Sequence, residues 1–189
     1  MKQTRRQFLG HSSLLAGSGL WSGSAFSQAV NGVPVAPSVA AAEAKAPPLP
    51  AVGSTLTLPE VKLLDGKQFQ PAQAKGRVLV LYWWASTCPF CAQQSPEMQK
   101  LWQAELAKGP QGLLMLTLSV DRKPDDALSY MKKKGYTFPA GFVTPEIQRA
   151  LPKPKGLPIT LVLGRDGRVL QAEKGQLFPE DVEQLNRWL

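Results

Sequence analysis

Hydrophobic residues follow two patterns along this chain, and together they predict alternating strands and helices. Continuous apolar runs at residues 78–82 and 113–119 have the length and composition of strands buried on both faces. Between them a helical pattern runs from the residues after Cys91 to about Lys108. Because a helix joins the two apolar runs, we expect a parallel strand–helix–strand crossover. Four apolar residues of this helix should face the sheet: Met98, Leu101, Trp102 and Leu106.

Further elements are predicted on both sides of this unit. Before it, the turn residues Asp65-Gly66 join two short runs in a hairpin, and another short strand precedes them at 56–58. After it, Thr144-Pro145 reads as the start of a helix that reaches Ala150. The remaining expectations are helices at 124–134 and 179–189, a short strand at 136–138, and an antiparallel hairpin of strands 159–163 and 169–171 around Arg165-Asp166-Gly167.

The protein has two cysteines, Cys88 and Cys91, and they stand where the first buried strand passes into the helix. Two cysteines separated by two residues are one helical turn apart, so they can form and break a disulfide with little backbone movement. Backbone N–H groups at the helix start lower the pKa of the first cysteine, and the thiolate is the nucleophile. We therefore expect Cys88 to be exposed and attacking, and Cys91 to be more buried and to resolve the mixed disulfide. Pro89 suits the first helical turn.

Other roles for the pair are open but fit less well. A structural disulfide would close too short a loop to constrain the unfolded chain. A zinc site needs more ligands, and the single histidine, His11, lies in the N-terminal segment. A c-type haem site needs histidine after the second cysteine, where Ala92 stands. The two thiols could also bind Cu(I), although Met98 and Met115 show no ligand spacing.

Charge adds little to this picture. The formal net charge of the 189 residues is +8, and the charges are scattered. The one basic cluster, at residues 132–134, falls at the end of an expected helix, where cations suit the helix dipole. A solvated helix face explains this cluster, so we expect no nucleic-acid partner.

The N-terminal segment has the order of an export signal. Residues 4–9, T-R-R-Q-F-L, resemble the twin-arginine motif, with Gly10 in place of its final lysine. A weakly apolar stretch and small residues near Ser27 follow, so we expect a signal peptide at residues 1–27, either cleaved or retained as an anchor. An Ala- and Pro-rich linker at 28–50 and one folded domain at 51–189 complete the expected organisation.

A second informative stretch is Gly156-Leu157-Pro158, at the start of the last hairpin. Proline is tolerated at the first residue of a strand, so a plain strand boundary explains it. The alternative is a cis peptide bond before Pro158, which is rare without a structural cause.

The element order and these two sites resemble the thioredoxin fold, and within it the TlpA/ResA-like thiol-disulfide oxidoreductases, over about residues 52–189. The resemblance rests on W-W-A-S-T-C-P-F-C, on Pro96 inside the helix, and on G-L-P-I-T-L-V-L-G-R-D-G-R-V. It implies an α/β fold with a central mixed sheet flanked by helices and an N-terminal β-hairpin. It also implies that Pro158 is a cis-proline packed against the dithiol. The residues expected to contact a partner are Trp84, Pro89, Phe90, Leu157 and Pro158.

The chain departs from these families at three positions around the dithiol. Tyr82 stands where thioredoxins have a buried aspartate, and Gln94 where many TlpA/ResA-like proteins have a glutamate. Thr87 replaces the tryptophan that precedes the first cysteine in thioredoxins. The usual proton acceptor for Cys91 is therefore missing, and Glu97 is only a weak substitute.

These observations predict a periplasmic thiol-disulfide oxidoreductase that reduces disulfides of partner proteins through Cys88 and Cys91. The alternatives are a thiol oxidase, favoured by C-P-F-C and the missing acids, and a Cu(I)-binding protein. We expect no cofactor and no bound metal. The expected partners are proteins with disulfides or dithiols and a membrane electron donor. We expect a monomer, because no heptad pattern or apolar edge argues for a dimer.

Overall fold

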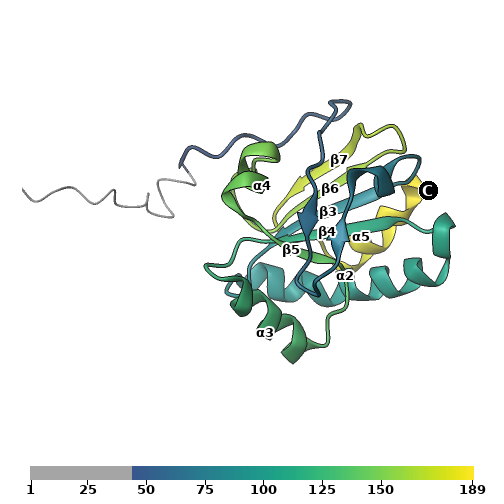
Figure 1. Cartoon of the computed structure of the whole chain (residues 1–189). Coiled ribbons are helices and arrows are strands. Elements are labelled where there is room, and N and C mark those ends of the chain that lie inside the picture. Colours follow the sequence, from purple (N-terminus) through teal and green to yellow (C-terminus); the bar gives the residue numbers. More distant parts are fainter. Residues whose placement is uncertain (1–43) are drawn as a thin grey trace, which may run out of the picture. The chain divides into compact units, whose positions relative to one another are not determined.

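The structure is a computed structural model that describes residues 44–189 (Figure 1). The expected signal at 1–27 and most of the expected linker at 28–50 lie outside the described residues. In the described part of the chain no helix is both long and apolar enough to cross a membrane.

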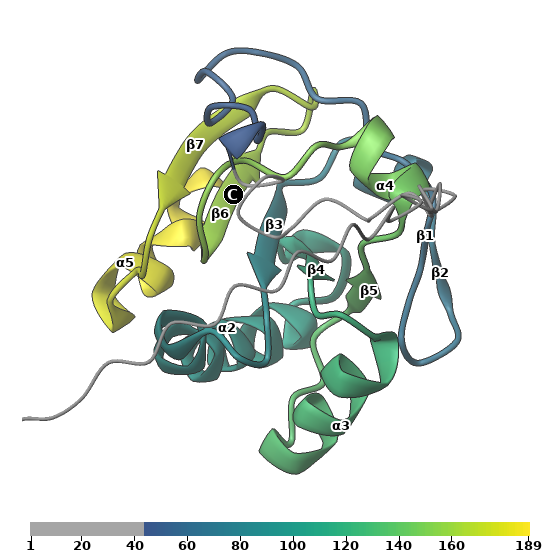
Figure 2. The same cartoon turned by 90° about the vertical axis from the view of Figure 1, so that its left-hand side faces the viewer.

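A five-stranded mixed sheet is the centre of the described domain, with strand order β5-β4-β3-β6-β7 (Figure 2). The central strand β3 (Leu79–Trp84) runs parallel to β4 (Leu114–Ser119) and antiparallel to β6 (Ile159–Leu163). At the edges, β5 (Ala140–Phe142) is parallel to β4, and β7 (Val169–Lys174) is antiparallel to β6. The predicted parallel crossover and the predicted C-terminal hairpin are both confirmed.

The alternation of β3 side chains divides the core into two layers. Val80, Tyr82 and Trp84 pack with helices α2 (Pro89–Ala107), α3 (Pro124–Lys134) and α5 (Pro179–Glu183). Leu79, Leu81 and Trp83 face the other side, where α4 (Pro145–Ala150) and the hairpin of β1 (Val61–Lys62) and β2 (Gln68–Phe69) cover the sheet. All six residues of β3 are buried, as expected for a central strand between two layers. The predicted fold class, a thioredoxin-like α/β fold with an N-terminal hairpin, is therefore confirmed.

Several predicted elements have the expected bounds because their local signals are strong. The helix α3 begins at Pro124, carries Asp125 and Asp126 in its first turn, and ends at the left-handed Gly135. The Thr144 side chain accepts a hydrogen bond from the Ile147 N–H at 3.3 Å, which caps α4. The interior Pro96 leaves α2 a single helix.

Other expectations were wrong. Residues 136–138 form no strand, and β5 begins two residues later at Ala140. Residues 56–58 form no strand either, although Thr55 makes an isolated bridge to Arg168. Leu106 is exposed, and Glu105 takes the inward position on α2. The last helix is short, because α5 ends at Glu183 and a 3-10 segment, Gln184–Trp188, follows it. Two further 3-10 turns lie at Pro71–Ala74 and Gly109–Gln111.

Candidate active site

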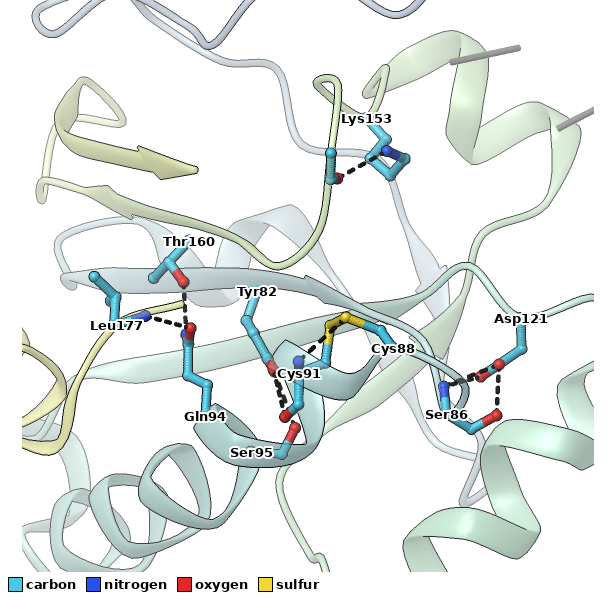
Figure 3. Close-up of a disulfide and its surroundings, with 11 residues drawn as sticks. Tyr82, Ser86, Cys88, Cys91, Gln94, Ser95, Asp121, Lys153, Thr160 and Leu177 are labelled. Carbon is cyan, nitrogen blue, oxygen red and sulfur yellow. Dashed lines mark hydrogen bonds between the residues drawn. A yellow bond between two sulfur atoms is a disulfide. The ribbon is translucent and has the colours of Figure 1, made fainter. Parts of the chain in front are cut away.

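The two cysteines are bonded to each other at the start of α2, at the carboxyl end of β3 (Figure 3). Their Cα atoms are 5.2 Å apart. Cys88 is the N-cap residue, and the Cys91 backbone N–H donates to its Sγ at 3.1 Å. Cys91 is only 1% exposed, whereas Cys88 is partly exposed and packs at the margin of the core. The outer sulfur is therefore the one that another molecule can reach.

The helix start provides the electrostatics that a thiolate needs. An N-cap side chain that accepts a backbone N–H takes the place of the capping oxygen found in most helices. Once the disulfide is reduced, the same N–H and the positive end of the α2 dipole stabilise a negative charge on the Cys88 sulfur. Pro89 follows at the first helical position, where its missing N–H costs no hydrogen bond.

Pro158 directly precedes β6, the strand that pairs with β3. Its neighbour Ile159 pairs with Trp83, near the end of β3 from which the cysteines follow. The Leu157–Pro158 peptide bond is cis, and Pro158 is buried. Leu157 is half-buried and packs against both core layers. Proximity of the two motifs is thus a property of the β3–β6 pairing, which no local sequence signal contains.

Of the remaining residues expected to contact a partner, two are exposed and one is buried. Pro89 is exposed, and the Phe90 side chain is 55% exposed, so both offer surface next to Cys88. Trp84 is fully buried and its indole N–H donates to Thr117 Oγ1 at 3.1 Å. Trp84 is therefore part of the buried core and presents no surface to a partner, which corrects the expectation of direct contact.

Tyr82 occupies the buried position at which thioredoxins have an aspartate. Its hydroxyl lies 3.0 Å from Ser95 Oγ and donates weakly to the Cys91 carbonyl oxygen at 3.5 Å. Burial raises the pKa of Tyr82 above its usual range, and the Ser95 hydrogen bond offsets only part of that effect. The phenol therefore stays protonated at neutral pH and does not serve as a base for Cys91.

Glu97 does not replace the missing acid. Its carboxylate pairs with Lys100 on the same helix at 2.9 Å, near the surface. Gln94 points inward and is fully buried. Within residues 44–189 no group of three or more His, Cys, Asp or Glu side chains is arranged to hold a metal ion.

Asp121 is a site residue that the sequence did not single out. It follows β4, and its carboxylate accepts the Ser86 backbone N–H at 3.0 Å and the Ser86 hydroxyl at 2.7 Å. The Ser119 hydroxyl donates to the same carboxylate at 2.8 Å. These contacts tie the segment just before Cys88 to the end of the neighbouring strand. A polar residue at the carboxyl end of a buried strand is the signal that could have found it.

Comparison with known proteins shows the family to which the chain belongs. The sequence model of the Redoxin family matches residues 51–189. The chain belongs to the Redoxin family. Its relatives include the thiol-disulfide oxidoreductase ResA of Bacillus thuringiensis subsp. konkukian, which is 26% identical over 125 residues that cover 64% of this chain and 68% of the relative. Sporulation thiol-disulfide oxidoreductase A of Bacillus subtilis is 24% identical over 155 residues, covering 80% and 86% of the two chains.

Solved structures agree on the fold. A thiol:disulfide interchange protein of the thioredoxin family from Chlorobium tepidum TLS superposes with a TM-score of 0.64 at 23% identity, over 73% of this chain and 97% of that one. StoA from Bacillus subtilis gives a TM-score of 0.58 at 22% identity, over 74% and 98% of the two chains. With its Cys88–Cys91 pair, the Redoxin-family chain is a thioredoxin-like thiol-disulfide oxidoreductase of the ResA/TlpA kind.

Proposed function

We propose that this protein is an exported, periplasmic reductase of disulfides in partner proteins. The observation that carries the proposal is the position of Cys88: it is the partly exposed N-cap of α2, and its Sγ accepts the Cys91 N–H at 3.1 Å. That arrangement makes the outer sulfur the nucleophile and keeps the inner one in reserve.

The reaction proceeds in two exchanges. The Cys88 thiolate attacks one sulfur of the partner disulfide; a Cys88–partner bond forms, and the other partner sulfur leaves as a thiolate. Cys91 then attacks Cys88 Sγ, the mixed disulfide breaks, and the second partner sulfur leaves with the electron pair. Two electrons have passed to the partner, and the Cys88–Cys91 disulfide remains. A dithiol donor must then reduce that disulfide before the next cycle.

Insulin reduction tests this assignment. Wild-type protein supplied with dithiothreitol should accelerate the precipitation of insulin chains, and the Cys88→Ser variant should lose that acceleration. A Cys91→Ala variant should instead accumulate mixed disulfides with its partners, because the second exchange cannot occur. Equal insulin reduction by Cys88→Ser and wild type would refute the proposal.

A thiol oxidase is the second candidate, and one observation favours it. Tyr82, which contacts Cys91, and Gln94, one turn further along α2, are both neutral, so neither supplies a carboxylate that could accept the Cys91 proton. Equilibration with glutathione separates the two directions. A reduction potential of about −120 mV is that of a strong oxidant, whereas one of about −270 mV is that of a thioredoxin-like reductase.

Export and partners complete the proposal. Arg5 and Arg6 would direct the chain through the twin-arginine route. In the periplasm a membrane dithiol protein would then supply the electrons. Cell fractionation tests the location: changing both arginines to lysine should retain the protein in the cytoplasm. Periplasmic recovery of that variant at the wild-type level would contradict this route.

A further inference from the structure

Gln94 is a buried glutamine that connects the dithiol helix to two distant parts of the chain. It lies one turn after Cys91 on α2 and is 0% exposed. Its Nε2 donates to Thr160 Oγ1 at 2.9 Å, and its Oε1 accepts the Leu177 backbone N–H at 2.8 Å (Figure 3). Thr160 stands two residues after Pro158 on β6, and Leu177 lies between β7 and α5.

This amide fixes how the helix turn that carries Cys91 sits on the strand that carries Pro158. Both of its contacts are buried, so neither is exchanged with water without cost. The second exchange of the proposed reaction requires the Cys91 sulfur to approach Cys88 Sγ in line with the bond that breaks. Small displacements of such reacting atoms reduce rates strongly. A side chain that holds this turn therefore acts on the chemistry without touching it.

The groups that pack around Cys91 supply no competing charge. The Tyr82 hydroxyl on β3 donates to the Cys91 carbonyl oxygen and is protonated. The two partners of Gln94, the Thr160 hydroxyl on β6 and the Leu177 N–H after β7, are also neutral. Glu173 on β7 pairs with Thr160 and is half-buried, and its carboxylate accepts the Gln171 amide at 3.2 Å. Three other charged side chains near this end of the sheet have partners of their own: Glu97 pairs with Lys100, Asp121 binds Ser86 and Ser119, and Lys153 donates to the carbonyls of Pro154 and Gly156.

We propose that Gln94 is a positioning residue for Cys91: its neutral amide aligns the inner sulfur for the second exchange and adds no acid–base group one turn further along α2. This inference rests on the proposed function. In that exchange the Cys91–Cys88 bond forms, the bond from Cys88 to the partner sulfur breaks, and the electron pair leaves with that sulfur. The Cys91 proton goes to the departing thiolate or to water, and residue 94 takes no part in its transfer.

Stopped-flow reaction of the reduced protein with 5,5′-dithiobis(2-nitrobenzoate) separates the two exchanges. The first release of thionitrobenzoate reports attack by Cys88, and the second reports attack by Cys91 on the mixed disulfide. Gln94→Leu should leave the first release near its wild-type rate and slow the second by about tenfold or more. A protein whose first release were no faster than that of a free thiol would refute the proposed function, whereas an unchanged second release would refute only the role of Gln94.

Gln99 provides a matched control on the same helix. It is also a buried amide, 8% exposed, and binds the backbone N–H groups of Thr137 and Phe138 and the Thr137 hydroxyl. Gln99→Leu therefore removes a comparable set of hydrogen bonds but no contact to the Pro158 strand. Its second release should keep the wild-type rate. Equal slowing in both leucine variants would show a general loss of packing and overturn the positioning role.

Gln94→Glu tests neutrality with little change of shape. A carboxylate there can accept both the Leu177 N–H and a rotated Thr160 hydroxyl, so the geometry is kept while a titrating group is added. The rate of the second release of wild type should rise with pH along one ionisation, that of Cys91, and Gln94→Leu should keep that single ionisation at a lower rate. Gln94→Glu should show a second ionisation. A Gln94→Glu profile identical to wild type would contradict the importance of a neutral side chain at residue 94 for the second exchange.

Discussion

The Asp121 carboxylate holds the Ser86 backbone N–H at 3.0 Å and the Ser86 hydroxyl at 2.7 Å, across 35 residues of sequence. Ser86 lies two residues before Cys88, and Asp121 lies two residues past the end of the parallel neighbour of the central strand. The segment before the nucleophile Cys88 is therefore held by Asp121 at Ser86, and α2 holds the segment at Cys88.

Asp121→Ala should weaken this tie in two measurable ways. It leaves a partly buried N–H and two hydroxyls without their acceptor, so the free energy of unfolding should fall by about 1–3 kcal/mol. The reduced protein should also react more slowly with iodoacetamide at Cys88, because the loop samples other conformations. Urea unfolding and alkylation rates check both effects. Full retention of stability and reactivity in Asp121→Ala would show that the contact has no such role.

Phe90 is the aromatic side chain next to the nucleophile that a protein partner can cover. Because it is 55% exposed, Phe90→Ser should change the free energy of unfolding by less than about 0.5 kcal/mol. Reduction of insulin should lose several-fold in kcat/KM, because apolar contact area with the partner is removed. Reaction with a small aromatic disulfide serves as the control and should change little. An equal loss with both substrates would place the effect on Cys88 itself.

Tyr82 predicts a dependence of stability on alkaline pH. Burial raises the pKa of Tyr82 in the folded state above the value of about 10 that it has when unfolded. The folded state thus favours the protonated phenol, so this contribution to stability is complete below about pH 10 and is lost as the pH rises beyond it. Tyr82→Phe should lose about 1 kcal/mol at pH 7 from the missing hydrogen bond.

The same variant should be less sensitive to alkali than wild type. Thermal unfolding at pH 8 and pH 11 measures how much stability each protein loses as the pH rises. Burial also raises the pKa of Tyr136, to about 12, and of Tyr130, so both proteins should still lose stability at high pH. Identical slopes for wild type and Tyr82→Phe would contradict the raised pKa of Tyr82.

The sequence predicted elements best where hydrophobic pattern and local chemistry agreed. The β3 run, the α2 pattern after Cys91 and the Asp-rich start of α3 all lie where expected. These signals are local: a buried strand needs continuous apolar residues, and a helix end needs particular capping groups. The dithiol followed from such signals, because its chemistry depends on spacing and on the helix start.

Long-range polar contacts account for the errors. Residues 136–138 look like a strand, but Gln99 Oε1 accepts the backbone N–H groups of Thr137 and Phe138 at 2.7 and 3.2 Å, so no strand pairs with them. Leu106 fits the helical stripe, yet Glu105 is buried in its place because its carboxylate accepts the Leu113 N–H at 3.2 Å. Side-chain hydrogen bonds of this kind leave no periodic trace in a sequence.

The site shows the same division. Cys88, Cys91 and Pro158 could be named from motifs, whereas the ties that hold them could not. Asp121 to Ser86 and Gln94 to Thr160 each join residues far apart in the chain, and only the β3–β4 and β3–β6 pairings bring them together. Trp84 was expected to contact a partner, but it is buried because it lies on the central strand β3, which is covered on both faces.

The central claim concerns the ionisation of Cys88, and titration of its thiolate tests it most directly. Absorbance at 240 nm of the Cys91→Ser variant should follow this ionisation alone, because the chain then contains a single cysteine. The N–H of residue 91 and the start of α2 should hold the pKa of the Cys88 thiol below the value of about 8.5 for a free cysteine, and unfolding in urea should restore that value. A folded protein whose Cys88 titrates at or above the unfolded value would contradict the account.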